Sequence, residues 1–169
     1  MKLSKRLFAL LLAIHMLLSI FAAGAIASSD EESGESTLAV YYTAQDAVDI
    51  AKVLYTECRS IPSTTEKACV AWTILNRADM QGISIYSVVR APRQFAFKEG
   101  TPVNDDLLTI AYDVLDRWNL EKNGQTEVGR VLPKDYIYFN GDGKHNYFRN
   151  SYKKPYKVWD YSLPSPYES

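Results

Sequence analysis

Two helix-like runs that meet at a short polar bend, within residues 46–77, constrain the fold of this chain more than any other stretch. In the first run, apolar residues recur every three to four positions, which is the spacing of one face of an α-helix. Glu57 continues this series, because it lies seven positions after Ile50 and three after Leu54. Its carboxylate is therefore predicted to point with the apolar residues, where an unpaired charge is costly.

Two simpler interpretations of Glu57 stand beside this one. A glutamate in the last turn of a helix can extend its side chain to water. It can also form an ion pair, for which Arg59 and Lys67 are the candidates. The choice among the three interpretations depends on the rest of the chain.

The ends of the two helices carry capping signals. The segment Thr43–Asp46 has the form of a capping box with Asp in place of Glu, so the first helix is predicted to run from about Ala44 to Arg59. Ser60-Ile61-Pro62 then breaks the helical pattern. Ser63–Glu66 is a second capping box, so the two helices are predicted to form a tight hairpin.

The N-terminal 27 residues have the pattern of a secretory signal. Basic residues precede an apolar run over 7–23, and Ala25-Ile26-Ala27 supplies small residues that favour cleavage at that point. The run is also close to the lower limit of about 17 residues for a membrane-spanning helix, so an uncleaved anchor is the alternative. An acidic, Ser-rich tether follows over 28–42, and 43–169 fits one domain. The working part of the chain is expected outside the cytoplasm.

The chain has two cysteines, Cys58 and Cys69, one in each half of the helical hairpin. In an exported protein they allow one disulfide, which would connect the two helices. The alternative is two small buried residues in a helix pair, because a bridge requires a Cα separation of about 4.4–6.8 Å. A nucleophilic role for Cys58 is disfavoured, since no sequence feature couples a histidine to it.

Further helices are predicted along the middle of the chain. The second helix is apolar on most sides, and Trp72 is expected in the core rather than stacked on a sugar. Residues 83–90 are predicted to form one or two helical turns, followed by a loop over 91–97. A third long helix is predicted to start at Asn104, whose side chain can cap it, and to close at Asn123-Gly124.

Beyond Arg130 the helical periodicity is lost and a hairpin is predicted. An aromatic strand over 136–139 precedes a turn at 140–143 and a second strand-like piece over 145–149. Tyrosine is frequent in 130–160, and basic residues outnumber acidic ones there. This composition suits stacking on sugar rings and attraction to an anionic polymer. A nucleic-acid surface has a similar composition, but the predicted export and the lack of a long basic run argue against it.

The sequence excludes several kinds of chemistry. It has no Gly-rich phosphate loop, no Cys or His cluster with metal spacing and no nucleophile elbow, and the predicted mature chain offers only His145 as an imidazole. No metal and no cofactor are therefore expected. What remains is carboxylate chemistry, which is the usual means of cleaving glycosidic bonds.

Five segments, in order, carry a resemblance to a known family. They are Ala51–Arg59, Glu66–Arg77 with its final Leu-Asn-Arg, Gln94-Phe95, Tyr138-Phe139-Asn140, and Gly143–Phe148 with its Gly-x-His-x-aromatic pattern. Together they resemble the spore cortex-lytic, SleB-type cell wall hydrolases over roughly residues 46–148. One departure is that Cys58–Pro62 replaces the usual Ala-Arg/Lys-Gly-Glu-Pro, so the second acidic residue of that loop is missing.

The resemblance implies a fold and a function. The family is similar to lysozyme-like lytic transglycosylases, so an α+β domain with a helical core and a short β-hairpin is expected. Its members cleave the glycan strand of peptidoglycan between N-acetylmuramic acid and N-acetylglucosamine. The expected partner is therefore the peptidoglycan strand, with no nucleic acid, and with a membrane only if the N-terminal segment stays uncleaved. A monomeric, secreted and cell-wall-associated enzyme is expected.

The resemblance also places the site residues. The family's catalytic glutamate falls on Glu57. Sugar-binding roles by hydrogen bonding and stacking fall on Gln94, Phe95, Tyr138, Asn140 and His145. Asn76 and Arg77 are expected to connect the second helix to the hairpin as scaffold.

The expected mechanism needs a single carboxyl group. Glu57, kept protonated by apolar surroundings, would act as general acid on the glycosidic oxygen and then as base on the muramic acid O6 hydroxyl, giving a 1,6-anhydro product. Lysozyme-like hydrolysis is the alternative and would normally use a second carboxylate, for which Asp135 and Asp142 are the candidates, since Asp105 and Asp106 are expected at a helix start. A non-catalytic glycan-binding module is a further alternative. A peptidase or amidase is disfavoured, because no nucleophile or metal site can be assembled.

Overall fold

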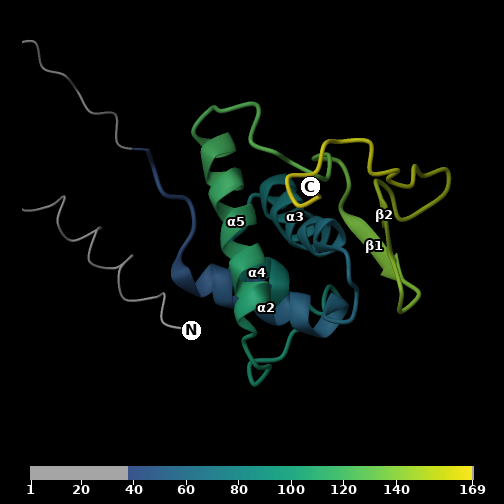
Figure 1. Ribbon diagram of the computed structural model, residues 1–169, viewed down its shortest axis with the longest axis horizontal. Coiled ribbons are helices and arrows are strands. Elements are labelled where there is room, and N and C mark those ends of the chain that lie inside the picture. Colours follow the sequence, from purple (N-terminus) through teal and green to yellow (C-terminus); the bar gives the residue numbers. More distant parts are fainter. Residues whose placement is uncertain (1–37, 169) are drawn as a thin grey trace, which may run out of the picture. The chain divides into compact units, whose positions relative to one another are not determined.

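The computed structural model describes residues 38–168. This part of the chain folds into four helices and one two-stranded antiparallel sheet, which confirms the predicted α+β class (Figure 1). The elements are α2 (Ala44–Cys58), α3 (Thr64–Gln81), α4 (Ile85–Arg90), α5 (Asp105–Lys122), β1 (Tyr138–Gly141) and β2 (Asn146–Arg149). The predicted signal sequence over 1–27 and the tether up to residue 37 lie outside the described residues. None of the helices within 38–168 combines the length and the apolar character that crossing a membrane requires.

The helix starts follow the predicted capping signals, with one difference. The capping box at the start of α2 is complete, because the side chains of Thr43 and Asp46 each bond to the other's backbone N–H. At the start of α3, Ser63 accepts from the backbone N–H of Glu66, but the Glu66 side chain does not return to Ser63. It bonds instead to the β-hairpin, at His145 and Asn146. The second capping box is therefore only half formed, because the carboxylate has stronger partners elsewhere.

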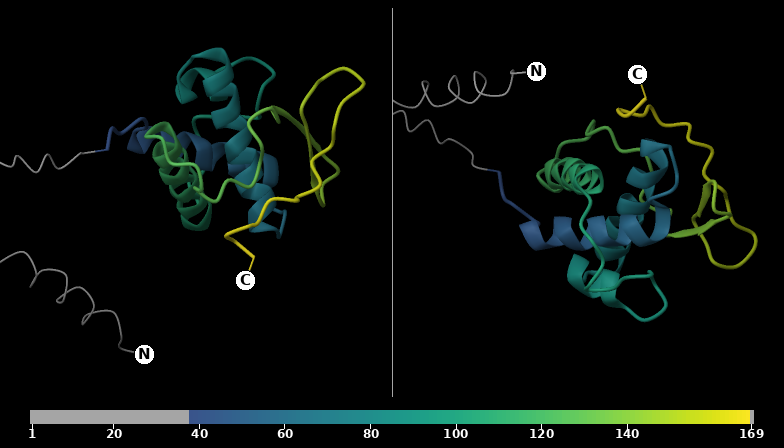
Figure 2. Two further views of the ribbon diagram at one scale, coloured as in Figure 1. Left: turned by 90° about the horizontal axis from the view of Figure 1, so that it is seen from above. Right: turned by 60° about the horizontal axis from the view of Figure 1, so that its bottom comes forward.

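The helices enclose one apolar core. α3 packs against α2, α4 and α5, and α2 also packs against α4 and α5. Trp72, at the centre of α3, is fully buried beneath the guanidinium of Arg130, which confirms its core assignment. Figure 1 shows α5 on one side of α3 and the hairpin on the other, and the second view in Figure 2 agrees. α3 is thus the central element that connects the helical part to the sheet.

The first strand of the hairpin lies two residues later than predicted, while the second falls within its predicted range. Tyr138 pairs with Arg149 and Gly141 with Asn146, so the ladder includes Asn140 and Gly141, which were predicted as turn. The actual turn is stabilised by Asp142, whose carboxylate accepts from the backbone N–H groups of Lys144 and His145. Tyr136 and Ile137 lie outside the ladder because their carbonyls accept from Asn76 and Arg77 of α3.

The chain after β2 first forms a loop and then returns to the helices. Val158 forms an isolated bridge with Arg149, so residues 150–157 project from the end of the hairpin (Figure 2). The segment that follows crosses α3, where the Thr65 hydroxyl contacts that of Ser165 at 2.5 Å. It ends against α5, where the hydroxyl of Tyr167 donates to Asp113 at 2.6 Å.

Candidate functional site

Glu57 lies in the last turn of α2 and is half-buried. The neighbouring apolar positions Leu54 and Cys58 are buried, as the helical periodicity predicts, but the Glu57 carboxylate itself is only partly enclosed. Its Oε1 accepts a hydrogen bond of 2.6 Å from the backbone N–H of Ala96. It forms no ion pair with Arg59, Lys67 or any other described residue. One carboxylate oxygen is therefore fixed by a loop of the protein, and the ion-pair interpretation is wrong for the described part of the chain.

The loop that contacts Glu57 runs from Ala91 to Glu99 and has a defined shape. Gln94 closes a turn by donating its backbone N–H to the carbonyl of Ala91, and Arg93 in that turn has a positive φ of 62°. A non-glycine residue in the left-handed region is uncommon and is found most often at turns and functional sites. The turn brings Gln94, Phe95 and the N–H of Ala96 to the end of α2. Two of the predicted sugar-binding residues thus lie on the loop that binds the Glu57 carboxylate.

Arg77 of α3 joins this loop to the hairpin. Its Nε donates to the carbonyl of Ile137 at 2.7 Å, and its Nη1 donates to the side-chain oxygen of Gln94 at 2.6 Å. Its guanidinium also lies 4.7 Å from the ring centre of Phe95 and 5.8 Å from that of Tyr138. Burial lowers the pKa of Arg77, and the nearby Tyr138 and Glu57 oppose this effect.

The scaffold role predicted for Arg77 is therefore confirmed at the hairpin. The neighbouring residue Asn76 also connects α3 to the hairpin segment, as predicted, because its side-chain amide donates to the carbonyls of Pro133 and Tyr136. The contact of Arg77 with Gln94 was not foreseen from the sequence. It makes Arg77 a positioning residue that fixes three of the predicted site residues, Gln94, Phe95 and Tyr138, around one guanidinium.

The hairpin presents two faces with different characters. Phe139 and the fully buried Phe148 pack together with a ring separation of 5.6 Å, and Phe139 also meets Phe95 at 6.3 Å. Since side chains alternate along a strand, Tyr138 and Asn140 lie on the opposite face, each opposite its cross-strand partner. Asn140 is exposed there, beside Tyr147. The predicted pair Tyr138 and Asn140 therefore shares one outward face.

His145 contacts a carboxylate at the start of α3. Its Nδ1 lies 2.9 Å from Oε1 of Glu66, and the backbone N–H of Asn146 donates to Oε2 of the same carboxylate at 2.7 Å. The hydrogen bond to Glu66 raises the pKa of His145. These contacts attach the hairpin turn to the start of α3, so His145 has a structural role, and its predicted role in sugar binding stays a prediction.

Glu66 is the carboxylate that sequence reasoning misplaced. It is buried, with 6% of its surface exposed, although its position after Ser63 is typical of an ordinary cap. The available signal was the early position of a glutamate in a helix that is apolar on most sides. A buried carboxylate needs a hydrogen-bond partner, and His145, the one imidazole of the predicted mature chain, was a candidate.

The two cysteines are free thiols, so the possible disulfide between Cys58 and Cys69 is not formed. The Cys58 thiol donates to the carbonyl of Leu54 at 3.3 Å, and the Cys69 thiol donates to that of Val131 at 3.6 Å. Burial raises the pKa of Cys58 to about 12; Lys67 opposes this rise, while Glu57 and Glu66 add to it. Both cysteines therefore act as small core residues, which was the stated alternative.

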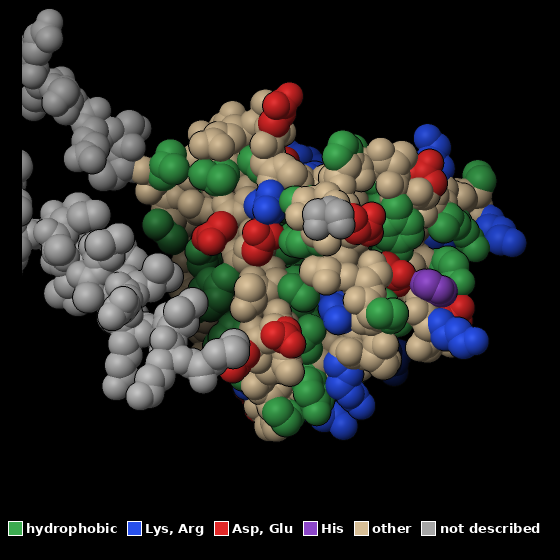
Figure 3. Space-filling view, in the orientation of Figure 1, with side chains coloured by type: hydrophobic (Ala, Val, Ile, Leu, Met, Phe, Trp, Pro, Cys, Tyr) green, Lys and Arg blue, Asp and Glu red, His purple; other side chains and the backbone are tan. Residues whose placement is uncertain are grey.

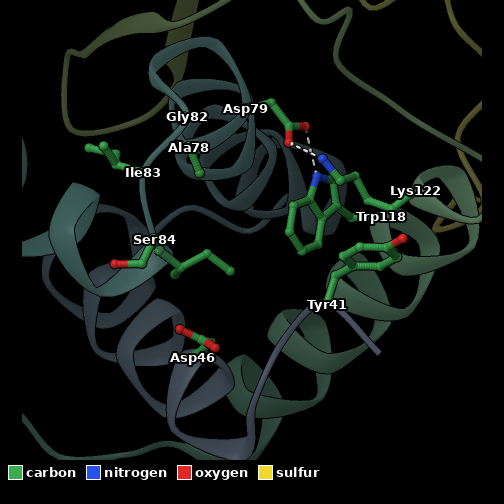
Figure 4. Close-up of a pocket in the computed structure, with 10 residues that line it drawn as sticks. Tyr41, Asp46, Ala78, Asp79, Gly82, Ile83, Ser84, Trp118 and Lys122 are labelled. Atoms are coloured by element: carbon green, nitrogen blue, oxygen red, sulfur yellow. Dashed lines mark hydrogen bonds and ion pairs between the residues drawn. The ribbon is translucent and has the colours of Figure 1, made fainter. Parts of the chain in front are cut away.

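Hollows in the described part of the molecule include one of about 390 Å³ lined by Asn76, Asp79, Met80, Lys134 and Asp135, and the following two. One, of about 380 Å³, is lined by Val89–Arg93, Phe95 and Phe97–Glu99, so it borders the loop that contacts Glu57. Figure 4 shows the other, of about 270 Å³, where the ends of α2, α3, α4 and α5 meet. There, Asp79 accepts from the ring N–H of Trp118 and from Lys122. The second hollow contains none of the predicted site residues.

Comparison of the chain with protein-family models, curated proteins and solved structures found no match.

Proposed function

We propose that this chain cleaves the glycan strand of peptidoglycan between N-acetylmuramic acid and N-acetylglucosamine, as a lytic transglycosylase of lysozyme-like architecture. The observation that carries the proposal is the convergence on one side of α3 of Glu57, the Gln94–Ala96 loop and Tyr138. These residues come from three distant segments. A helical core with a small β-hairpin suits the proposed architecture.

Glu57 acts first as general acid and then as general base. As acid it donates its proton to the glycosidic oxygen, so the bond from that oxygen to C1 of muramic acid breaks and the N-acetylglucosamine leaves with a free 4-hydroxyl. The resulting carboxylate then takes the proton of the muramic acid C6 hydroxyl, whose oxygen attacks C1. The product is a 1,6-anhydro sugar, and Glu57 regains its proton.

The geometry around Glu57 suits this cycle. Oε1 is held by the N–H of Ala96, and Oε2 has no hydrogen-bond partner among the described residues, so it is available to a substrate. Gln94 and Tyr138, fixed by Arg77, offer a polar group and an aromatic ring beside the carboxyl group.

The other carboxylates favour a route with one catalytic group. Asp142 is engaged in the hairpin turn, where the backbone N–H groups of His145 and Lys144 and the hydroxyl of Tyr147 lower its pKa to about 2. Glu66 is bound by His145 and Asn146. Asp105 and Asp106 occupy the first turn of α5, as expected. Asp135 accepts only a 3.4 Å hydrogen bond from Asn150 and is the remaining candidate for a hydrolytic second carboxylate.

Digestion of purified cell walls tests the proposal. The mature chain and its Glu57→Gln variant are incubated with walls, and the soluble fragments are identified by mass spectrometry. We expect 1,6-anhydro muropeptides from the unchanged chain and a loss of about 10²–10⁴-fold in the variant, the usual contribution of a general acid. The matched control is Glu127→Gln, which removes the same charge from an exposed glutamate in the segment after α5.

Each other outcome has a distinct meaning. If the walls release free reducing ends instead, and these are absent with Glu57→Gln, the reaction is hydrolysis. The Asp135→Asn variant would then test for the second carboxylate. Wall binding without any cleavage would support the glycan-binding module instead. Full activity in a folded Glu57→Gln variant would show that Glu57 is not the acid.

A further inference from the structure

The loop after β2 is held at its base and stands beside the proposed site. The backbone N–H of Trp159 donates to the carbonyl of Phe148 at 2.9 Å, and Val158 bridges Arg149. The backbone N–H of Lys157 donates to the side chain of Asn150 at 2.9 Å. Residues 151–157, called the basic arm below, therefore form a compact loop with closed ends. A loop fixed in this way loses little entropy when it binds a ligand.

An aromatic contact connects the basic arm to the proposed site. Tyr152 is 71% exposed, yet its ring lies 6.0 Å from that of Tyr138. Tyr138 in turn lies under the guanidinium of Arg77, which holds Gln94 beside Glu57. The arm is thus an extension of the surface that carries Glu57. An exposed tyrosine at this place gives a second ring on which a sugar can stack.

The basic arm carries positive charge without partners of opposite sign. Lys153, Lys154 and Lys157 are exposed, and none of them forms an ion pair with a described residue. Figure 3 shows basic side chains gathered at the outer edge of the molecule on the hairpin side. At the base of the arm, Asn150 donates to the carboxylate of Asp135 at 3.4 Å.

Arg149 adds a further positive charge at the base of the arm. It is half-buried over the ring of Tyr156, with its guanidinium 4.9 Å from the ring centre. Its Nε is buried and has no hydrogen-bond partner, and the residue forms no ion pair within the described chain. The charge of Arg149 is therefore not neutralised by any described carboxylate.

We infer that the basic arm, with Arg149, recognises the carboxylates of the peptidoglycan strand, namely the free carboxylates of its peptide stems and of muramic acid lactyl groups that carry no stem. This inference rests on the proposed function, because the arm extends the surface on which the cleaved strand would lie. Aromatic rings beside cations match a polymer of sugar rings that bears carboxylates at regular intervals. The arm therefore selects strands that keep their carboxylates over neutral glycans.

Binding to chemically modified walls tests the inference in a catalytically silent protein. The Glu57→Gln chain is sedimented with walls freed of phosphodiester polymers by hydrofluoric acid, and with the same walls after amidation of their carboxylates. We expect binding to persist after the acid treatment and to fall on amidation. Adding Lys153→Gln and Lys154→Gln should weaken binding to the unamidated walls about fivefold, as two exposed ion pairs predict, and the effect should shrink in high salt.

The matched control removes two lysines elsewhere. Lys122→Gln with Lys134→Gln lowers the net charge equally, but these lysines pair with Asp79 and Glu121 near α5, so wall binding should not change. Loss of binding after the acid treatment alone would assign the arm to phosphodiester polymers and overturn the inference. Equal binding of the arm variant and the control would overturn it too. If walls bind through the arm but are never cleaved by the unchanged chain, the proposed function fails while the inference stands.

Discussion

A single arginine determines most of the geometry around Glu57. Arg77 uses Nε for the hairpin carbonyl of Ile137 and Nη1 for Gln94, and its planar face covers Phe95. These three interactions need a flat group with donors in fixed directions, which lysine lacks. The residue is only 6% exposed, and loss of its bond to Ile137 would leave a buried carbonyl without its donor.

Replacement of Arg77 by lysine therefore tests the positioning role. An ammonium group can reach only part of this set, so Gln94 and Phe95 should lose their fixed places. We expect cell wall cleavage to fall about 10²-fold, the effect of a small misplacement of a catalytic group, and the free energy of unfolding to fall by about 1–3 kcal/mol. Wall digestion and urea denaturation measure the two effects. A positioning role would be contradicted if Arg77→Lys lost stability but kept full cleavage.

The sequence could predict which residues gather near Glu57 but not what holds them. Helical spacing placed Glu57 on the inner side of α2, and the resemblance named Gln94, Phe95 and Tyr138. The hydrogen bond from Ala96 joins a side chain to a backbone group 39 positions away, and no periodic pattern encodes such a contact. The contact of His145 with Glu66 could not be predicted for the same reason, because the two residues are 79 positions apart in sequence.

At the scale of elements, the helices were predictable because local signals determine them. The caps at Thr43, Ser63 and Asn104 each lie directly before the helix that they start. The first strand of the hairpin begins two residues later than predicted, because distant partners occupy the backbone before it. Asn76 and Arg77 take the carbonyls of Tyr136 and Ile137, which removes these residues from the strand.

The contact between His145 and Glu66 makes the attachment of the hairpin sensitive to pH. The hydrogen bond to Glu66 raises the pKa of His145 above its ordinary value of 6.5. A raised folded-state pKa means that the contact contributes its full stability below about pH 6.5 and loses it as the pH rises through the folded-state value. An NMR titration of the His145 ring should give a midpoint above 6.5, and Glu66→Gln should return it to the ordinary range. If the midpoint is the same in both proteins, His145 and Glu66 do not interact in solution.

An ion pair clamps α4 and the following loop to α2. Arg90, at the end of α4, binds Asp49 at 2.5 Å and Glu99 at 2.6 Å, and the Asp49 side chain is only 1% exposed. Replacing Arg90 by methionine leaves this carboxylate buried and unpaired, which should cost about 3–5 kcal/mol of unfolding free energy. Chemical denaturation measures the loss. The double variant with Asp49→Leu should recover much of it, and no recovery would mean that Arg90 acts mainly through Glu99.

At the scale of the whole molecule, a helical core supports a C-terminal part that has little regular structure. Residues 123–168 contain only two strands of four residues each, and they depend on α3 and α5 for their placement. Apolar residues of this part, among them Leu132 and Phe148, belong to the core, and Arg130 adds an ion pair of 2.5 Å with Glu121 of α5. The proposed site therefore lies where the helices, which local sequence signals determine, meet the C-terminal part, which distant contacts hold in place.

The last described residues fasten this C-terminal part to the helices. Tyr167 is half-buried against the core and donates to Asp113 of α5, while the hydroxyl of Thr65 donates to Glu168. Deleting residues 163–169 should therefore lower the unfolding free energy by roughly 2–4 kcal/mol, from one aromatic side chain and its charged hydrogen bond. Tyr167→Phe keeps the ring and removes only the hydrogen bond to Asp113, so the free energy of unfolding should fall by about 1–2 kcal/mol.

Urea denaturation of the two variants separates these contributions. If the tail only covers the surface, both variants will match the unchanged chain. If it anchors the C-terminal part, the deletion will also increase amide exchange in β2, because Tyr161 and Trp159 hold β2 from the same segment by bonds to Asn146 and Phe148. Faster exchange in β2 without a change in α2 would show that the sheet side opens independently of the helical core.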